Sequence, residues 1–169
     1  MEKSYKEYLN QINTFVFDVD GVLTDGTIQV STHGELLRTM NMKDGYAMKA
    51  AVEAGYTVCI ISGGKNEGVR KRLRGLGITD IYLGVHDKVE QMDEFFDIYS
   101  IKPDEVLYMG DDIPDYHPMK LVGLPCCPQD AAPEIKELSK YVSHRKGGKG
   151  CVRDVIEQVL KVQGKWIEK

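Results

Sequence analysis

Two aspartates, Asp18 and Asp20, stand directly after a run of apolar residues near the start of the chain. Residues 15–17 predict a strand buried on both faces, of the kind found inside parallel sheets. Ligands of open α/β sheets bind at the carboxyl ends of the strands. Two carboxylates there repel each other and resist desolvation, which a divalent cation relieves. The pair predicts metal-assisted chemistry, with an ordinary strand-to-turn junction as the alternative.

The same pattern returns after a second apolar run, residues 105–109, where the sequence continues Gly-Asp-Asp-Ile-Pro-Asp. Its carboxylates are Asp111, Asp112 and Asp115. Carboxylates that arrive from two strands can supply the oxygens and the charge that Mg²⁺ requires, while positions remain for water and phosphate. A solvated acidic turn would be unremarkable alone, but the repetition favours one shared Mg²⁺ site.

Two further polar residues follow the same logic. Ser62 ends the apolar run 56–61 and precedes a helix predicted over residues 65–73, whose amino end would attract an anion. A simple N-cap is the alternative for this serine. Lys88 opens another predicted helix, where the helix dipole disfavours a cation, so it indicates an anionic partner. A solvated surface lysine is the alternative there.

The composition describes an ordinary globular protein of one domain, residues 1–169. Its 42% hydrophobic and 28% charged residues are typical values, and the net charge of −4 gives no support to nucleic-acid binding. No apolar run is long enough to span a bilayer, and the first residues are too polar for a secretion signal. We therefore expect a cytoplasmic protein with no membrane partner.

Cysteines and histidines add no predicted site. The cysteines have neither a disulfide framework nor a zinc spacing, and they are expected to be reduced thiols: Cys59, Cys126, Cys127 and Cys151. The histidines are scattered and are interpreted as surface or local structural residues: His33, His86, His117 and His144.

Strands and helices alternate along the chain, which predicts a doubly wound parallel α/β sheet. Residues 27–40 interrupt the alternation with two short strand-like runs around a Gly-containing turn, and they predict a β-hairpin. A lone hairpin is marginal in water, so we expect its apolar residues to pack on a second copy of the chain. The tail, about residues 163–169, carries Trp166, which indicates docking, with a neighbouring subunit as the candidate.

A flexible basic loop, residues 146–150, precedes the last predicted helix. Because Arg153 follows closely, contact with an anionic substrate is favoured over a merely solvated connection.

The motifs now described resemble, in their order, the four motifs of the haloacid-dehalogenase-superfamily phosphatases. They cover about residues 15–115. Further stretches resemble the capless, tetrameric branch that contains the 3-deoxy-D-manno-octulosonate 8-phosphate phosphatases, and they extend the resemblance over nearly the whole chain: residues 21–26, 34–37, 43–46 and 147–153.

The resemblance implies a role for each candidate residue. Asp18 would be the nucleophile that forms an aspartyl-phosphate, and Asp20 the general acid/base. Asp18, the main-chain carbonyl of Asp20 and Asp111 would hold Mg²⁺. The phosphoryl oxygens would be bound by Ser62, with Gly63 beside it, and by Lys88. Asp115, and Asp112 with it, would orient Lys88 or a metal-bound water.

The branch also implies a core without a cap domain, and a homotetramer in which hairpins join and a neighbouring subunit completes each active site. The implied substrate is a small sugar acid phosphate, 3-deoxy-D-manno-octulosonate 8-phosphate, hydrolysed during synthesis of lipopolysaccharide precursors. A nine-carbon keto sugar acid 9-phosphate is the rival. The branch is expected to carry an arginine where this chain has Gly64, so the substrate carboxylate is assigned to Lys65, Arg70 or the tail.

Receiver domains of response regulators are the alternative from another class, because they also combine acidic residues, a hydroxyl, a lysine and Mg²⁺ in a small doubly wound sheet. They are signalling modules. Receivers place an acidic pair after the first strand and the phosphorylated aspartate on a later one, and the hairpin has no place in them. Intact Asp18 and Asp20 also disfavour an inactive relative that kept only the fold.

Overall fold

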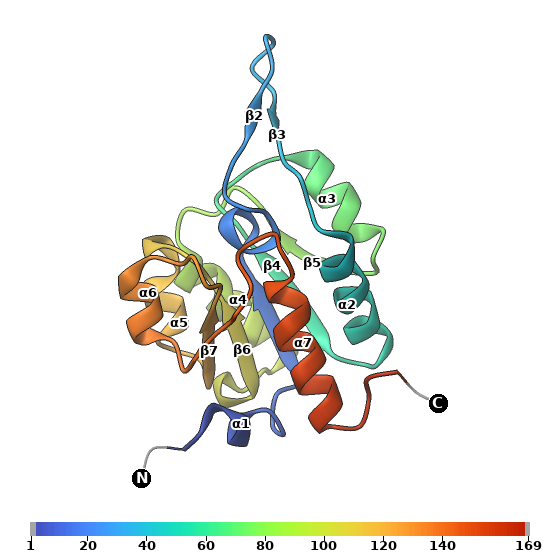
Figure 1. Ribbon diagram of the computed structural model, residues 1–169, viewed down its shortest axis with the longest axis vertical. Helices are drawn as coiled ribbons and strands as arrows, with labels where there is room; N and C mark the ends of the chain where they lie inside the picture. Colours follow the sequence, from blue (N-terminus) through green and yellow to red (C-terminus); the bar gives the residue numbers. More distant parts are fainter. Residues whose placement is uncertain (1–2, 168–169) are drawn as a thin grey trace.

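The computed structural model describes residues 3–167, and its centre is a six-stranded parallel sheet (Figure 1). The strand order is β5-β4-β1-β6-β7-β8, so the first strand lies in the middle. This confirms the predicted fold class, and no cap domain is found among residues 3–167. The strands are β1 (Thr14–Phe17), β4 (Thr57–Ile61), β5 (Asp80–Tyr82), β6 (Val106–Met109), β7 (Leu124–Cys127) and β8 (Tyr141–Val142).

Helices cover both faces of this sheet. The apolar residues of α2, α3 and α7 share one core with Phe15 and Phe17 of β1, whereas those of α4, α5 and α6 share the other core with Val16. Strands buried on both faces read as continuous apolar runs, which is why the sequence signal was clear. The helices are α1 (Tyr5–Tyr8), α2 (Met42–Glu53), α3 (Glu67–Arg74), α4 (Lys88–Tyr99), α5 (Tyr116–Met119), α6 (Pro133–Leu138) and α7 (Cys151–Val162).

The register of the three central strands places their carboxyl ends side by side. Phe17 of β1 pairs with Ile60 of β4 on one side and with Met109 of β6 on the other. The polar residues that follow these strands therefore emerge at one edge of the sheet.

Two helices differ from the predictions. α3 begins at Glu67 and not at residue 65, because the side chain of Asn66 caps it by accepting the N–H of Val69 at 3.0 Å. The preceding residues stay in a loop. α5 was not predicted; it is a single short turn of helix that contains Pro118 and so carries little sequence signal.

The hairpin follows β1, as predicted, and projects from the body of the molecule (Figure 1). Its paired strands are shorter than expected, only β2 (Gln29–Val30) and β3 (Leu36–Leu37). Apolar residues on it remain exposed, with 67% of Val30 and 48% of Leu37 accessible. Such a ribbon has no apolar layer of its own to rest on.

The tail after α7 returns to the body of its own subunit. Trp166 is half-buried, with its ring against that of Tyr46 and beneath the guanidinium of Arg153. The tryptophan that was expected to dock on a neighbour is thus packed within the chain. Residues 168 and 169 of the predicted tail, and the first two residues, lie outside the described residues.

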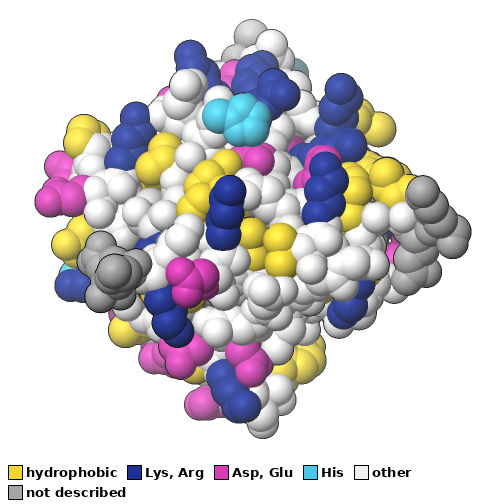
Figure 2. Space-filling view, turned by 60° about the horizontal axis from the view of Figure 1, so that its bottom comes forward, with side chains coloured by type: hydrophobic (Ala, Val, Ile, Leu, Met, Phe, Trp, Pro, Cys, Tyr) yellow, Lys and Arg dark blue, Asp and Glu magenta, His cyan; other side chains and the backbone are white. Residues whose placement is uncertain are grey.

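The surface has a mixed character. Figure 2 shows Lys and Arg side chains interspersed with Asp and Glu over the end of the molecule that carries the two termini. Among residues 3–167, no helix combines the length and the apolar character needed to cross a membrane. The four cysteines are buried free thiols.

We predict that Gln163→Ala lowers the free energy of unfolding by about 1–3 kcal/mol. The Gln163 amide donates to the carbonyls of Leu9 and Ile12, both at 2.8 Å, and accepts from the Tyr56 hydroxyl. The substitution leaves these groups unpaired where α7 meets the N-terminal segment. Urea denaturation measures the change, with the exposed Gln129→Ala as the control. Equal stability of the two variants would contradict the prediction.

Candidate active site

Three carboxylates meet at the carboxyl edge of the sheet. Asp18 follows β1, while Asp111 and Asp115 follow β6. One oxygen of each lies within 4.8 Å of one oxygen of both others. The structure thus brings the two acidic motifs of the sequence to one point.

Lys88 reaches the same point from the first residue of α4. Its ammonium lies 3.2 Å from Asp18 Oδ2 and 2.7 Å from Asp115 Oδ1, and only 7% of its side chain is exposed. Asp87 caps the helix by accepting the N–H groups of Val89 and Glu90, so the end of the helix tolerates the buried cation. Lys88 is a component of the cluster and not a solvated lysine.

Asp115 is held by donors at both oxygens. Its Oδ1 accepts from Lys88 and from the hydroxyl of Tyr108, at 2.8 Å, and its Oδ2 accepts from the N–H of Asp111 at 3.1 Å. This carboxylate is fully buried and orients Lys88. Sequence reasoning missed Tyr108. The only signal was a tyrosine inside a buried strand, whose hydroxyl requires a partner.

A tight turn over Val19–Leu23 carries Asp20 past the end of β1. It begins with Asp18 Oδ1 accepting the N–H of Val19 at 2.7 Å. Gly21 has φ +86°, and a methyl group at this position would overlap the carboxylate of Asp111. Only glycine therefore permits the turn to approach the cluster this closely.

The electrostatics of the cluster are unfavourable without a counter-ion. Burial raises the pKa of Asp18 well above its ordinary range, and the charge of Asp115 raises it further, against the effect of Lys88. Burial, then Asp115, raises the pKa of Asp111 to about 7. Burial opposes the charged form of Lys88, but Asp18 and Asp115 outweigh it and raise its pKa. Three carboxylates therefore share one ammonium.

These residues fit a hard divalent cation. They offer several carboxylate oxygens, close together and in excess of the available positive charge, which is the donor set that such ions prefer. Asp115 is already committed to three donors. Of the three carboxylates, Asp18 and Asp111 are therefore the two that remain free to hold the ion.

A cleft of about 560 Å³ opens above the cluster and contains the predicted phosphate-binding residues. Ser62 is 2% exposed, and its hydroxyl accepts the N–H of Gly64 at 3.2 Å. The lining includes Asp18, Asp20, Ser62, Gly63, Lys88, Asp111 and Asp112. Asp112 also caps the short turn that follows it by accepting the N–H of Ile113.

Arg38, from the base of the hairpin, is a second residue that sequence reasoning missed. It grips Asp20 with two contacts, Nε to Oδ1 at 3.0 Å and Nη2 to Oδ2 at 3.2 Å. Its Nη1 donates to the carbonyl of Leu36. A side chain at Gly64 would crowd this guanidinium, so glycine at this position leaves room for Arg38. No local pattern marks such a pairing.

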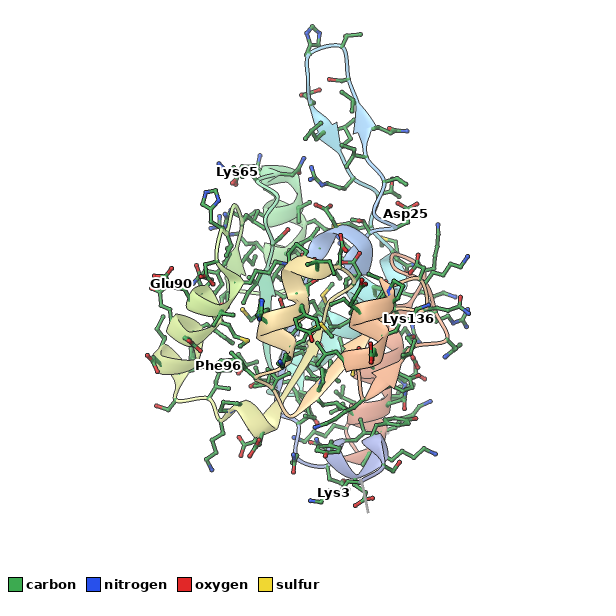
Figure 3. The ribbon with its side chains drawn as sticks, turned by 90° about the vertical axis from the view of Figure 1, so that its left-hand side faces the viewer. Lys3, Asp25, Lys65, Glu90, Phe96 and Lys136 are labelled. Carbon is green, nitrogen blue, oxygen red and sulfur yellow. The ribbon has the colours of Figure 1, made fainter. Side chains whose placement is uncertain are left out.

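The two residues predicted to bind the substrate carboxylate, Lys65 and Arg70, lie in different places. Lys65 is exposed near the base of the hairpin, at the same end of the molecule as Asp25 (Figure 3), with its aliphatic stem along Gly84. Arg70 instead points to its own helix and sheet, where it contacts Glu67 and donates to the carbonyl of Ile81. Arg70 is therefore not brought to the cleft.

Two other sequence expectations concern His86 and the basic loop, and only the second needs correction. His86 is an exposed surface residue, as expected, and it also lines the cleft. The basic loop 146–150 packs on the turn after β1, and Lys149 and Arg153 face a separate groove of about 780 Å³ beside α7. No member of the carboxylate cluster lines that groove, so its size does not make it the catalytic site.

Comparison with known proteins agrees with this geometry. A model of the haloacid dehalogenase-like hydrolases matches residues 75–155. The 3-deoxy-D-manno-octulosonate 8-phosphate phosphatase KdsC of Salmonella typhi is 38% identical over 154 residues, which are 91% of this chain and 82% of the relative. The chain belongs to this family of haloacid-dehalogenase-superfamily phosphatases.

Solved structures of this phosphatase family share the whole fold. The enzyme of the same description from Yersinia pestis has a TM-score of 0.94 at 34% identity, covering 98% of this chain and 89% of its own. The enzyme from Moraxella catarrhalis, in complex with magnesium, phosphate and KDO, has a TM-score of 0.91 at 29% identity, covering 95% and 92%. Membership of this phosphatase family excludes the receiver-domain alternative.

We predict that Asp111→Asn raises the thermal unfolding midpoint of the protein in EDTA at pH 8 by roughly 2–8 °C. The pKa of Asp111 is raised to about 7, first by burial. A carboxyl group with a raised pKa costs stability as pH increases from about 4, its unfolded value, through 7. The gain from asparagine is therefore absent near pH 4 and complete above pH 7. Thermal unfolding at both pH values measures it.

A divalent cation should make the wild-type protein more stable than Asp111→Asn, the reverse of the order expected in EDTA. Added Mg²⁺ is expected to stabilise the wild-type protein and to leave Asp111→Asn nearly unchanged, because the variant loses a charged oxygen ligand. Asp104→Asn, at an exposed position away from the cluster, is the control for the loss of one negative charge. A lower midpoint for Asp111→Asn in EDTA at pH 8 would refute the account of charge repulsion.

Proposed function

We propose that this chain is an Mg²⁺-dependent phosphatase that hydrolyses 3-deoxy-D-manno-octulosonate 8-phosphate through a covalent phosphoryl group on Asp18. The observation that carries the proposal is the position of Asp18, at the end of β1 with Lys88 at 3.2 Å and Asp111 beside it. The activities of the relatives from Salmonella typhi and Yersinia pestis support the choice of substrate.

Asp18 is the nucleophile. One of its oxygens accepts the Val19 N–H, which fixes the rotation of the carboxylate, and the other faces Lys88 and the cleft. Attack on phosphorus forms an oxygen–phosphorus bond and breaks the bond to the sugar oxygen. Water then attacks the phosphoryl group on Asp18 and releases inorganic phosphate.

Positive charge and N–H groups make this attack feasible, because an anionic nucleophile must approach an anionic phosphate. Lys88 neutralises charge from its fixed position between Asp18 and Asp115. Ser62 and the main chain of Gly63 also line the cleft and offer donors to the phosphate. Mg²⁺ held by Asp18, Asp111 and the Asp20 carbonyl would supply further charge neutralisation and orient the phosphate.

Asp20 is the general acid and base. It protonates the sugar oxygen as the ester bond breaks and then takes a proton from the attacking water. Its carboxylate lines the cleft, 39% exposed, and Arg38 holds it in a fixed orientation. Proton transfer requires a positioned carboxyl group, and the hairpin supplies that positioning.

The sugar acid carboxylate requires a cation beside the phosphate site. Arg70 is engaged elsewhere, whereas Lys65 follows Gly64 of the cleft lining and Arg38 pairs with Asp20 of that lining, and we assign this role to Lys65 and Arg38. Gly64 is the observation that keeps a nine-carbon keto sugar acid 9-phosphate as the second candidate substrate, since an arginine is expected at this position in the octulosonate enzymes.

We predict that Asp18→Asn lowers Mg²⁺-dependent phosphate release by at least about 10³-fold, because the neutral amide is not a nucleophile. A phosphate-release assay measures turnover on 3-deoxy-D-manno-octulosonate 8-phosphate. Asp87→Asn, which keeps a capping side chain next to Lys88, is the matched control and should retain activity. Turnover of Asp18→Asn near the wild-type rate would rule out the covalent route.

The same assay distinguishes the two candidate substrates. The eight-carbon ester should show the higher kcat/KM in a side-by-side comparison with the nine-carbon 9-phosphate. A higher value for the nine-carbon ester would transfer the assignment to it while leaving the phosphatase chemistry intact.

We further infer that four chains associate through their hairpins and that a neighbour covers each cleft. The exposed apolar residues of the hairpin support this, since a two-stranded ribbon gains stability by packing on another surface: Ile28, Val30, Leu36 and Leu37. Neither β2 nor β3 contributes a residue to the cleft lining, and no cap domain covers the cleft among residues 3–167.

We predict that the double change Val30→Asp and Leu37→Asp converts a tetramer to smaller species, because charges on the packed faces of the ribbons cannot be desolvated. Light scattering at micromolar concentration measures the mass. Ile98→Asp, at an exposed apolar position on α4, is the control and should leave the mass unchanged. A wild-type monomer under these conditions would contradict the inferred assembly.

A further inference from the structure

Asp44 is a buried carboxylate with no part in the chemistry above. It is the third residue of α2, with 1% of its surface exposed. Its Oδ1 accepts the N–H of Arg153 at 2.9 Å, and its Oδ2 has no hydrogen-bond partner among the described residues. Burial raises its pKa. A carboxylate buried with one oxygen unpaired is costly, so its presence here indicates that its contact with the start of α7 has a role.

That contact is at the start of α7. The residue before this helix is Gly150, with φ +108°, and it has no side chain to cap the free N–H groups of the first turn. Arg153 is the third residue of α7, the usual recipient of an N-cap side chain. Asp44 thus supplies from α2 the cap that the sequence before α7 lacks.

The residues just before and at this helix start, 147–151, form what we call the glycine segment, and it lies on the turn after β1. The N–H of Gly148 and the thiol of Cys151 donate to the carbonyl of Val22, at 2.9 and 3.2 Å. A methyl group at Gly147 would overlap the carbonyl of Gly21. The glycine segment therefore blocks movement of the turn toward α7.

Gly21 touches the active site on its other side, where a methyl group would overlap the carboxylate of Asp111. The turn that carries Asp20 is therefore confined between the glycine segment and the carboxylate cluster. We propose that Asp44 is a positioning residue of the active site: by capping α7, it holds the glycine segment against the turn and so fixes the place of Asp20.

This inference rests on the proposed function, because it uses the role of Asp20 in protonating the leaving group. A displaced Asp20 should slow an ester with a basic leaving group far more than one whose leaving group departs readily as an anion. The two substrates for the test are 3-deoxy-D-manno-octulosonate 8-phosphate and p-nitrophenyl phosphate. For both substrates, kcat/KM reports the steps from binding to departure of the leaving group, and not the later hydrolysis of the phosphoryl group on Asp18.

Asp44→Ala is expected to lower kcat/KM for the octulosonate ester by about 10–100-fold, the size of effect that small misplacements of catalytic groups produce. The value for p-nitrophenyl phosphate should fall by no more than about 3-fold. Asp44→Asn keeps an oxygen that can accept from Arg153 and should restore the octulosonate ester to within about 3-fold of wild type. Equal losses on both substrates, or no rescue by asparagine, would overturn the proposal.

Gln163→Ala is the matched control, since it loosens the other end of α7 without touching the turn. It should reduce stability and leave the ratio of the two kcat/KM values unchanged. Asp20→Asn is the reference for the proposed function. If Asp20→Asn leaves kcat/KM for the octulosonate ester unchanged, the proposed role of Asp20 is wrong. If Asp20→Asn lowers kcat/KM mainly for the octulosonate ester and Asp44→Ala does not, only the present inference fails.

Two measurements remain available if Asp44→Ala does not fold. Cys151→Ala removes one contact of the glycine segment with Val22. It should lower the ratio of kcat/KM for the octulosonate ester to kcat/KM for p-nitrophenyl phosphate by about 3-fold, because the turn is slightly displaced. The single tryptophan, Trp166, contacts Arg153 and Tyr46, so its fluorescence reports the docking of α7 in Asp44→Asn. An unchanged ratio in Cys151→Ala would overturn the proposal.

Discussion

Repulsion among the carboxylates of Asp18, Asp111 and Asp115 is the constraint on which the rest of the structure depends. Their nearest oxygens lie within 4.8 Å, and Lys88 is the ammonium between them. The parallel sheet makes such crowding tolerable, because its strands are anchored by two apolar cores and cannot move apart. The fold thus holds together like charges whose repulsion a bound cation would reduce.

Glycines let the backbone pack closely around the carboxylate cluster. Gly21 lies against Asp111 on one side and against Gly147 on the other, and neither contact leaves space for a side chain. The catalytic turn is therefore held by steric exclusion as much as by hydrogen bonds. Packing on one side of the sheet, around α2 and α7, is in this way transmitted to a carboxylate at its edge.

Much of the fold and part of the site followed from local sequence patterns. Asp18, Ser62, Lys88 and Asp111 could be found because each directly follows an apolar strand or opens a helix, and parallel strands bring such positions together. Arg38, Tyr108 and Asp44 could not be found this way. Their partners lie 18, 7 and 109 positions away, at distances fixed by tertiary packing. The start of α3 was displaced by a single capping side chain, Asn66.

The register of the hairpin strands determines where Arg38 lies. Arg38 lies one residue beyond β3, whose pairing Gln29–Leu37 and Val30–Leu36 is very short. A slip of the two strands by one residue would turn alternate side chains to the opposite face. The guanidinium would then leave Asp20, although no residue of the cleft itself had changed. Insertions or deletions in this ribbon are therefore constrained by chemistry at its base and not only by the shape of its tip.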